Sequence, residues 1–537
     1  MDKLEEDRTK SFNFMKTGWL LPGIFSLLFS ICMMFGGSLE RRGSVTFTSP
    51  LLWLGIVMLS LIVTPIVKLL WDRLKGVRTL RRRQPMQFGQ RSMMCTFLIV
   101  AVIIFLCYLP IFLAVYPGFF VYDAQDELMQ VITRNFSTHH PLLHVLLMGG
   151  MVQAGYKVTG SYNLGIAFYT LFQMLVLSCF FSWCICRLKQ EGMGRMGRIA
   201  AALYFGIFPV VVMFALCSAK DGLFSAMLLA MVMVLRNWQA ERKTDNKGLI
   251  LFSIAGVLMM LLRHNGFYAF VVFAVLVFRK KKLLLSAGMA VCYLLISSGL
   301  AFVLHADDSE HQELLTVPIQ QMSRVYSLEG DELTEEEKQT LYEILPKEAL
   351  LRYTPKVSDG VKVAFDNEAY GKNPGKYLKL WLSLGLKHPF AYLNAWFMTS
   401  YGFWYPGATI DVYRGNTVFT FTYEDSSYFG YEVEQPGERH SFLPWLNELY
   451  RSFSLDVIWQ RIPVLSLLFS PGFLFWFTAF VLGFLCYAGK RNRAVPYLLP
   501  LLVWATVLLG PTYLVRYVVF WWFLLPVLCF ELLSFDN

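Results

Sequence analysis

Long apolar segments separated by short polar stretches run through almost the whole chain. A helix needs roughly 20 apolar residues to cross a bilayer, and only 16% of the 537 residues are charged, against about 25% in soluble proteins. The pattern therefore predicts an all-α polytopic membrane protein with about 12 (11–14) transmembrane helices. The twelve predicted spans lie at about 18–36, 51–70, 95–115, 162–186, 199–217, 222–236, 249–262, 266–279, 283–304, 463–487, 495–510 and 513–533.

Basic residues cluster in several of the polar stretches, and the clusters predict an orientation. They begin at Arg73, Arg187, Arg236, Arg279 and Lys490, and Lys and Arg are enriched on the cytoplasmic side of membrane proteins. Placing each cluster in the cytoplasm also puts both termini there, in a multi-pass protein of the plasma membrane. The net charge of +10 follows from these clusters, so no nucleic-acid partner is expected.

Two further apolar stretches do not fit this count of spans. Counting residues 141–157 as a span would move the basic cluster at Arg187 outside, and counting residues 389–404 would move the acidic region that follows inside. We expect both to form juxtamembrane or re-entrant helices, which are tolerated where the backbone is buried in protein.

The polar region divides the predicted spans into two transmembrane modules. Residues 1–304 form an N-terminal module whose first outer loop, 116–160, carries the candidate catalytic residues, and residues 461–537 form the C-terminal transmembrane helices. Residues 305–460 between them contain more than half of the 38 Asp and Glu residues. This composition predicts a small extracytoplasmic portion, with the membrane-associated helix of residues 389–404 inside it.

Two local patterns suggest the structure of the extracytoplasmic portion. Thr334 and Glu337 have the spacing of a capping box ahead of an apolar-periodic run, which predicts the start of a helix. Residues 413–431 are rich in Thr, Val, Phe and Tyr and suggest a short hairpin. An α or α+β fold is therefore expected.

Three acids lie close together in the first outer loop. Asp123, Asp126 and Glu127 would share one face if this segment is helical, because positions i, i+3 and i+4 of a helix point the same way. Carboxylates this close repel one another unless a cation, a metal or a shared proton compensates. Asp123 and Glu127 could hold Mg²⁺ or Mn²⁺ through oxygen, and all three acids are candidate catalytic residues.

Histidines follow the acids at His139, His140 and His144. His140 and His144 are four residues apart and could supply half of a metal site. A zinc site needs three or four ligands, and no Cys or further suitable ligand lies nearby in the sequence. Packing, or contact with an acceptor hydroxyl, is therefore the favoured role for these side chains.

The twelve-span topology places several short polar turns on the outer side with these acids. Charges near bilayer depth are costly and usually face the interior of a bundle or a wet cavity. Lys and Arg there suit a phosphate group, although Lys220 and Asp221 could merely neutralise each other and Arg263 could merely anchor a span end. The candidate substrate-binding residues are Tyr122, His139, His140, Lys220, Asp221, Arg263, His264, Asn265, Arg516 and Tyr517.

The outer loop also resembles a known superfamily. It begins Tyr-Pro-Gly at Tyr116, continues as Tyr-Asp-Ala-Gln-Asp-Glu to Glu127, and reaches His-His-Pro ahead of an apolar helix. With about a dozen spans, this resembles the GT-C superfamily of membrane glycosyltransferases, which includes protein O-mannosyltransferases and lipid A aminoarabinose transferases. The motif covers about 30 residues. The family's His-Pro-Pro-like segment is matched only in part, since Leu142 follows Pro141.

The resemblance implies a GT-C-like fold, a polyprenyl-phosphate sugar donor and inversion of the anomeric centre. It implies that Asp123 is catalytic, with Asp126 or Glu127 as the second acid. No sugar-recognition motif of the family can be matched in residues 305–460, so the sugar and its acceptor stay open.

These patterns together predict an integral-membrane glycosyltransferase in contact with membrane lipids. It would move a sugar from a polyprenyl-phosphate donor to an extracytoplasmic acceptor, which could be a cell-envelope glycan, a lipid or a protein. Asp123 would act as general base, while Lys220, Arg263 and Arg516 would hold the lipid phosphate. The alternative is a flippase or transporter of lipid-linked sugars, but the internal repeats common in transporters are not visible in this sequence.

Overall fold

The computed structural model describes residues 2–76, 90–241, 245–308, 311–409, 430–431 and 433–533. Helices make up the fold, and the described residues contain isolated β-bridges but no strand. Seven helices are long and apolar enough to cross a membrane, and an eighth span exists if the bent pair α8 (Arg195–Ile207) and α9 (Pro209–Ala215) counts as one. The seven are α1 (Asp2–Arg42), α2 (Pro50–Gly76), α3 (Gln90–Ala114), α7 (Tyr162–Gln190), α10 (Asp221–Glu241), α13 (Lys280–Leu304) and the stretch Val515–Leu533, which includes α26 (Phe520–Leu533). These helices indicate a membrane-embedded protein, as the sequence predicts.

The number of clear spans is smaller than the predicted twelve. Each predicted span coincides with a helix or with consecutive helices, but several helices are short. Turns with polar residues or proline interrupt them, for example at Arg263. The shorter apolar helices are α11 (Asn246–Leu262), α12 (His264–Val277) and α23 (Pro471–Tyr487), followed by α25 (Leu498–Val507).

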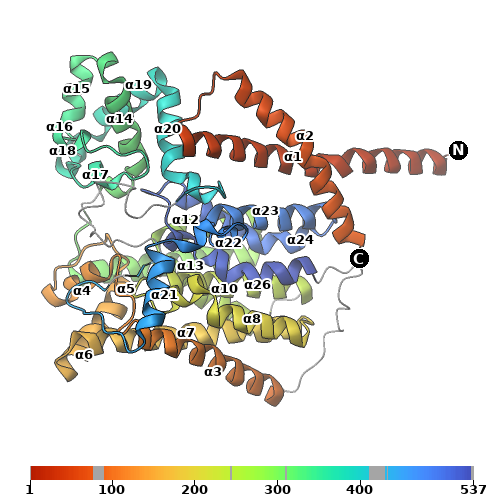
Figure 1. The fold of residues 1–537 in the computed structure, drawn as a ribbon, viewed down its shortest axis with the longest axis horizontal. Helices are drawn as coiled ribbons and strands as arrows, with labels where there is room; N and C mark the ends of the chain where they lie inside the picture. The colour runs from red at the N-terminus through yellow and green to blue at the C-terminus, as the bar shows by residue number, and fades with distance from the viewer. Residues whose placement is uncertain are drawn as a thin grey trace.

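Helix α10 is the central helix of the bundle (Figure 1). In its most apolar stretch 94% of the residues are buried, whereas the corresponding value for α13 is 11%. A helix that is apolar all round belongs in the interior, and the middle of α10, from Gly222 to Leu235, has no charged residue. Its charged residues Asp221 and Arg236 lie towards its two ends and are both buried.

The two stretches that were expected not to span do not qualify as spans in the structure. Residues 142–159 form α5 (Leu142–His144), a π-helical turn (Val145–Gly149) and α6 (Gly150–Thr159). In Figure 1 they gather with α4 (Ala124–Thr133) at one end of the bundle. The second stretch forms α20 (Pro389–Ser400), which has only 12 residues.

A glycine allows the π-helical turn to pack closely on α4. A Cβ atom on Gly149 would lie 2.8 Å from the Val131 side chain and 3.1 Å from the Glu127 carbonyl oxygen. The backbone of the turn therefore approaches the helix that carries Glu127 more closely than a larger residue would allow.

Residues 311–400, which we call the cap, have a hydrophobic core of their own. The main cap helices are α14 (Thr316–Glu329), α15 (Glu335–Tyr342), α19 (Pro374–Lys387) and α20. The capping box of Thr334 and Glu337 is present as predicted. The hairpin suggested for residues 413–431 lies outside the described residues except for Gly430 and Tyr431.

Candidate functional site

Two loops that are far apart in the sequence pair at the end of the bundle. The Phe119 N–H donates to the Leu216 carbonyl oxygen over 3.0 Å, and the Ser218 N–H donates to the Phe119 carbonyl oxygen over 2.9 Å. This pairing brings the loop that follows α3 against the loop that precedes α10. Asp123 and Lys220, which flank the paired residues, are thereby brought together.

Asp123 accepts hydrogen bonds from two cationic side chains. Lys220 Nζ lies 2.5 Å from Asp123 Oδ2. The guanidinium of Arg516 binds both oxygens, with Nη1 at 3.0 Å from Oδ1 and Nη2 at 2.6 Å from Oδ2. A bidentate arginine fixes the plane of the carboxylate as well as its charge. The Asp123 side chain is still 26% exposed, while those of Lys220 and Arg516 are 8% and 6% exposed.

A second carboxylate, Asp221, joins the remaining arginine to this pair. Arg263 Nη1 lies 2.6 Å from Asp221 Oδ1, and Arg516 Nε lies 3.1 Å from Asp221 Oδ2. Arg516 therefore bridges Asp123 and Asp221. We call Asp123, Glu127, Lys220, Asp221, Arg263 and Arg516 the Asp123 network; its three carboxylates balance its three cations.

Glu127 connects the Asp123 network to a buried chain of hydrogen bonds. It accepts from Lys220 Nζ at 3.2 Å and contacts His144 Nδ1. His144 Nε2 lies 2.9 Å from the Tyr169 hydroxyl, which donates to Gln173 Oε1 over 3.0 Å. Glu127, His144, Tyr169 and Gln173 are each at most 1% exposed.

The series of hydrogen bonds from Glu127 to Gln173 ends at the loop that carries Lys220. The amide nitrogen of Gln173 donates to the carbonyl oxygens of Phe214, Ala215 and Cys217. Cys217 is three residues before Lys220, whose ammonium returns to Glu127. The closed ring of contacts fixes the position of the ammonium group in a region where an unsatisfied polar group would be costly.

The charges of the Asp123 network favour the ionised form of each partner. Burial raises the pKa of Asp123, but the charges of Arg516 and Lys220 outweigh it and hold the pKa well below its usual value. Burial also raises the pKa of Glu127, yet His144 and Lys220 lower it to about 2. Burial lowers the pKa of Lys220, but the charges of Asp123 and Glu127 outweigh this effect, so the pKa of Lys220 is raised overall. In this arrangement Asp123 is charged and is a weak base.

Two tyrosines lie against the arginines of the network. The guanidinium of Arg516 is 4.4 Å from the centre of the Tyr122 ring, and that of Arg263 is 5.0 Å from the Tyr517 ring. Both distances permit cation–π attraction. Tyr122 has φ +65°, an uncommon backbone conformation for a residue with a side chain and one often found at functional sites.

Four other predicted residues have their partners elsewhere or lie beside the network. His139 is 3.9 Å from Glu313, Asn265 donates to Thr506, and His264 is 3.4 Å from the Tyr293 hydroxyl. Asp126 makes no ion pair with any described residue. Burial and the charge of Asp123 raise the pKa of Asp126.

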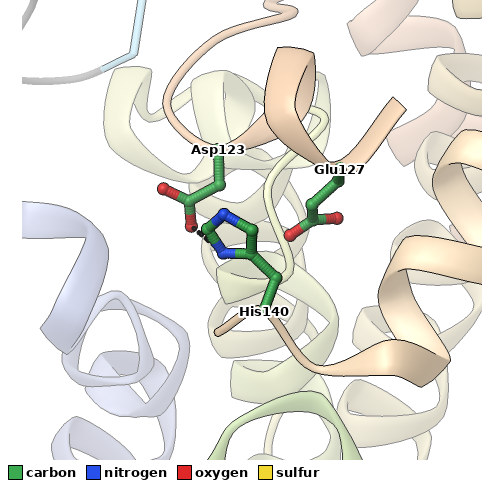
Figure 2. A group of neighbouring side chains, drawn as sticks. All are labelled: Asp123, Glu127 and His140. Atoms are coloured by element: carbon green, nitrogen blue, oxygen red, sulfur yellow. Dashed lines mark ion pairs between the residues drawn. The ribbon is translucent and has the colours of Figure 1, made fainter. Parts of the chain in front are cut away.

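Asp123, Glu127 and His140 have the composition of a metal site (Figure 2). One ligand atom from each lies within 4.8 Å of the others, and His140 Nδ1 is 3.7 Å from Asp123 Oδ2. Burial lowers the pKa of His140 to about 3, so the imidazole is neutral. However, Lys220 and Arg516 bind the same carboxylate oxygens. A divalent ion would add charge to a set that is already balanced, so these residues do not fit a resident Mg²⁺ or Mn²⁺.

Tyr169 and Gln173 are not among the residues predicted from the sequence, and for His144 the sequence favours packing or contact with an acceptor hydroxyl. The sequence does contain a pattern that could have identified Tyr169 and Gln173. They are polar, four residues apart and therefore on one face of an apolar segment. A polar pair within a predicted span commonly faces the interior of a bundle, where it needs partners.

The fold and the site define a helical membrane-embedded protein with a buried network of paired charges at one end of its bundle. DUF6020, described as a family of unknown function, has a family model that matches residues 128–535. The match covers well over half of the chain, and the chain therefore belongs to the DUF6020 family. Lys220, Arg263 and Arg516 lie within the matched region, whereas Asp123 and Glu127 lie just before it. No curated protein and no solved structure matches the chain.

Proposed function

We propose that this protein is an integral-membrane glycosyltransferase of the GT-C type that uses a polyprenyl-phosphate sugar as donor. The observation that carries the proposal is the partly exposed carboxylate of Asp123, held between Lys220 and Arg516. In this proposal the helices α8 with α9, α11, α12, α23 and α25 complete twelve crossings of the plasma membrane. The termini are cytoplasmic, and the cap and the Asp123 network face the outside.

The reaction needs a base and a site for the leaving group. An acceptor hydroxyl loses its proton to Asp123, and its oxygen attacks the anomeric carbon of the donor. The bond between that carbon and the phosphate oxygen breaks, and the electron pair leaves with the polyprenyl phosphate. Fixed cations at the phosphate lower the barrier because negative charge develops there.

The resting contacts suggest how donor binding would prepare the base. All three cations are paired with carboxylates, so a phosphate can bind them only by exchange. In the proposed exchange, phosphate oxygens replace Asp123 on Arg516 and Lys220. The released carboxylate then lies beside an anion instead of two cations, which raises its pKa and makes it a stronger base. Donor binding therefore precedes deprotonation of the acceptor.

The middle of α10 favours a transferase over a flippase. A transporter of charged lipid headgroups needs polar groups along its path. The central helix has charged side chains near both ends but none from Gly222 to Leu235. This distribution fits chemistry at one membrane surface better than transit across the membrane.

The experiment is sugar transfer in membranes from a set of radiolabelled polyprenyl-phosphate sugars. Wild type is compared with Asp123→Asn at equal expression, because Asn keeps the size but loses the basicity. Glu368→Gln is the matched control, since Glu368 lies on the cap surface and its ion pair among the described residues is with exposed Lys372. We expect Asp123→Asn to lose about 100-fold or more and Glu368→Gln to match wild type.

Three outcomes would contradict parts of the proposal. If wild type and Asp123→Asn transferred sugar equally well, Asp123 would not be the base of the reaction. Label that crosses a vesicle membrane without forming product would identify a flippase instead. If no donor of the set gave product and no lipid was flipped, the protein would not be a transferase for these lipids.

A further inference from the structure

The cap contains a second group of potential metal ligands, far from the Asp123 network in sequence. His388 Nδ1 contacts Glu329 Oε2 and lies 3.8 Å from Glu332 Oε2. One ligand atom from each of the three residues lies within 4.8 Å of the others. Glu329 ends α14, Glu332 belongs to the 3₁₀ turn Gly330–Glu332, and His388 lies between α19 and α20. The group therefore joins two segments of the cap.

The histidine of this group is held firmly, while one acid remains open to solvent. The His388 N–H donates to the Leu384 carbonyl oxygen, and the His388 carbonyl accepts from the Tyr392 N–H. These bonds end α19 and begin α20. The His388 side chain is 6% exposed, whereas that of Glu332 is 71% exposed. A metal bound here would have buried nitrogen on one side and room for water ligands on the other.

The charge of this group is unbalanced, in contrast with the Asp123 network. Among the described residues, neither Glu329 nor Glu332 forms an ion pair with a lysine or arginine, and His388 is the partner of both. The nearby Lys387 is paired with Glu337 instead. Two carboxylates that converge on one imidazole without a fixed cation suit a divalent ion, which would neutralise both.

We propose that Glu329, Glu332 and His388 bind a divalent transition-metal ion of the Zn²⁺ class. Imidazole nitrogen and carboxylate oxygen are zinc ligands, and three protein ligands with an open position for water form a common zinc arrangement. Ca²⁺ and Mg²⁺ prefer oxygen ligands alone. The ion links the end of α14 to the junction of α19 and α20, and so holds the cap together where its chain turns into α20. The site does not depend on the proposed transferase function.

The test uses full-length protein, purified with a tag that lacks histidine, stripped with chelator and studied in detergent. Thermal unfolding and titration calorimetry are measured with ZnCl₂, and with MgCl₂ and CaCl₂ for comparison. We expect Zn²⁺ to bind at one site and to raise the melting temperature by about 3 °C when it is well above its dissociation constant. Millimolar Mg²⁺ and Ca²⁺ should leave the melting temperature unchanged.

Variants identify the residues that bind the ion. Glu332→Gln changes an exposed side chain, so the variant is expected to fold, and it should weaken Zn²⁺ binding at least tenfold. His388→Gln should abolish binding. Glu368→Gln, on the same cap, and Asp123→Asn, in the other candidate group, should bind Zn²⁺ like wild type. The proposal is overturned if wild type binds no Zn²⁺, if Glu332→Gln binds it unchanged, or if Asp123→Asn alone abolishes binding.

Discussion

Helices α10 and α26 are connected by ion pairs near both ends, and the two connections differ in the side chains around them. At one end Asp221 pairs over 3.1 Å with Arg516, which lies in the 3₁₀ turn Val515–Val518 ahead of α26. At the other end Arg236 pairs with Glu531 over 2.7 Å. Both connections are buried, and each is joined to a partly exposed carboxylate, that of Asp123 (26% exposed) in the first and that of Glu191 (18% exposed) in the second. The Asp123 carboxylate also lies 3.7 Å from the His140 imidazole.

The second connection is built mainly from arginine–glutamate pairs, and Arg236 also lies 5.9 Å from the centre of the Phe530 ring. We call it the Arg236 cluster: Arg236 also binds Glu191 over 2.8 Å, and Arg493 lies 2.6 Å from Glu531. Its two arginines and two glutamates are balanced and come from four places at helix ends. The Asp123 network instead includes a loop carboxylate and contacts histidine and tyrosine side chains. In the proposed transferase, the Arg236 cluster orients helices, whereas the Asp123 network holds the reacting groups.

The comparison predicts that loss of Arg236 affects stability most. Arg236→Ala leaves the half-buried Glu191 without its cation and the buried Glu531 with Arg493 alone, and breaking a buried pair costs about 3–5 kcal/mol. Thermal unfolding of the purified protein should show a large fall in melting temperature, with unchanged transfer per folded molecule. A variant that stays stable but loses transfer would place chemistry at the Arg236 cluster and break the comparison.

Loss of Arg263 should affect activity more than stability. A charge-assisted hydrogen bond contributes about 1.5–3 kcal/mol, so Arg263→Ala should lower kcat/KM for the donor about 10- to 100-fold. Arg352→Ala, at an exposed position on the cap, is the control and should leave the kinetics unchanged. If Arg263→Ala and Arg352→Ala had the same kinetics, Arg263 would not be a ligand of the donor phosphate.

The free energy of unfolding should depend on pH through the ionisation of Glu127. Its pKa of about 2 in the folded protein lies below the ~4.3 of an unfolded glutamate. The stabilisation from its ionised form is therefore complete above the unfolded value and is lost as pH falls from about 4.3 towards 2. Unfolding measured between pH 7 and pH 2.5 should show this loss, and Glu127→Gln should reduce it. An identical pH profile for the two proteins would contradict the assignment.

The smallest effect is expected at Tyr169, whose hydroxyl connects His144 to Gln173. Tyr169→Phe keeps the ring but removes this link, which should cost about 1–3 kcal/mol of stability. It should also lower kcat several-fold while the donor KM stays near the wild-type value, because the link positions Lys220 only indirectly. Phe172→Leu is the control, since it alters packing beside the Tyr169 ring and keeps the hydroxyl. An unchanged kcat for Tyr169→Phe would contradict the positioning role.

The sequence predicted the apolar helices and the grouping of Asp123 with Lys220, Arg263 and Arg516. Apolar length and basic clusters carry that information, because the bilayer restricts both. The number of clear spans was not predictable in the same way. Helices such as α11 and α12 are short, and their length depends on where the Arg263 turn interrupts them.

The partners within each cluster could not be read from the sequence. Arg236 begins one basic cluster and Arg493 belongs to the cluster that begins at Lys490, so the sequence marks both only as cytoplasmic residues. In the structure both pair with Glu531 from the last helix. Such pairs join residues 38 to 295 positions apart, and only tertiary packing decides them. The same holds for His144, Tyr169 and Gln173, whose role follows from the packing of α7 against the loop before α10.

The most direct test of the account measures two properties of Asp123→Asn in one purified sample. One is sugar transfer, and the other is affinity for the product polyprenyl phosphate. The exchange of Asp123 for phosphate on Arg516 and Lys220 predicts that transfer falls about 100-fold or more while the phosphate binds more tightly than to wild type. Transfer at the wild-type rate, with unchanged affinity for the phosphate, would contradict the central claim.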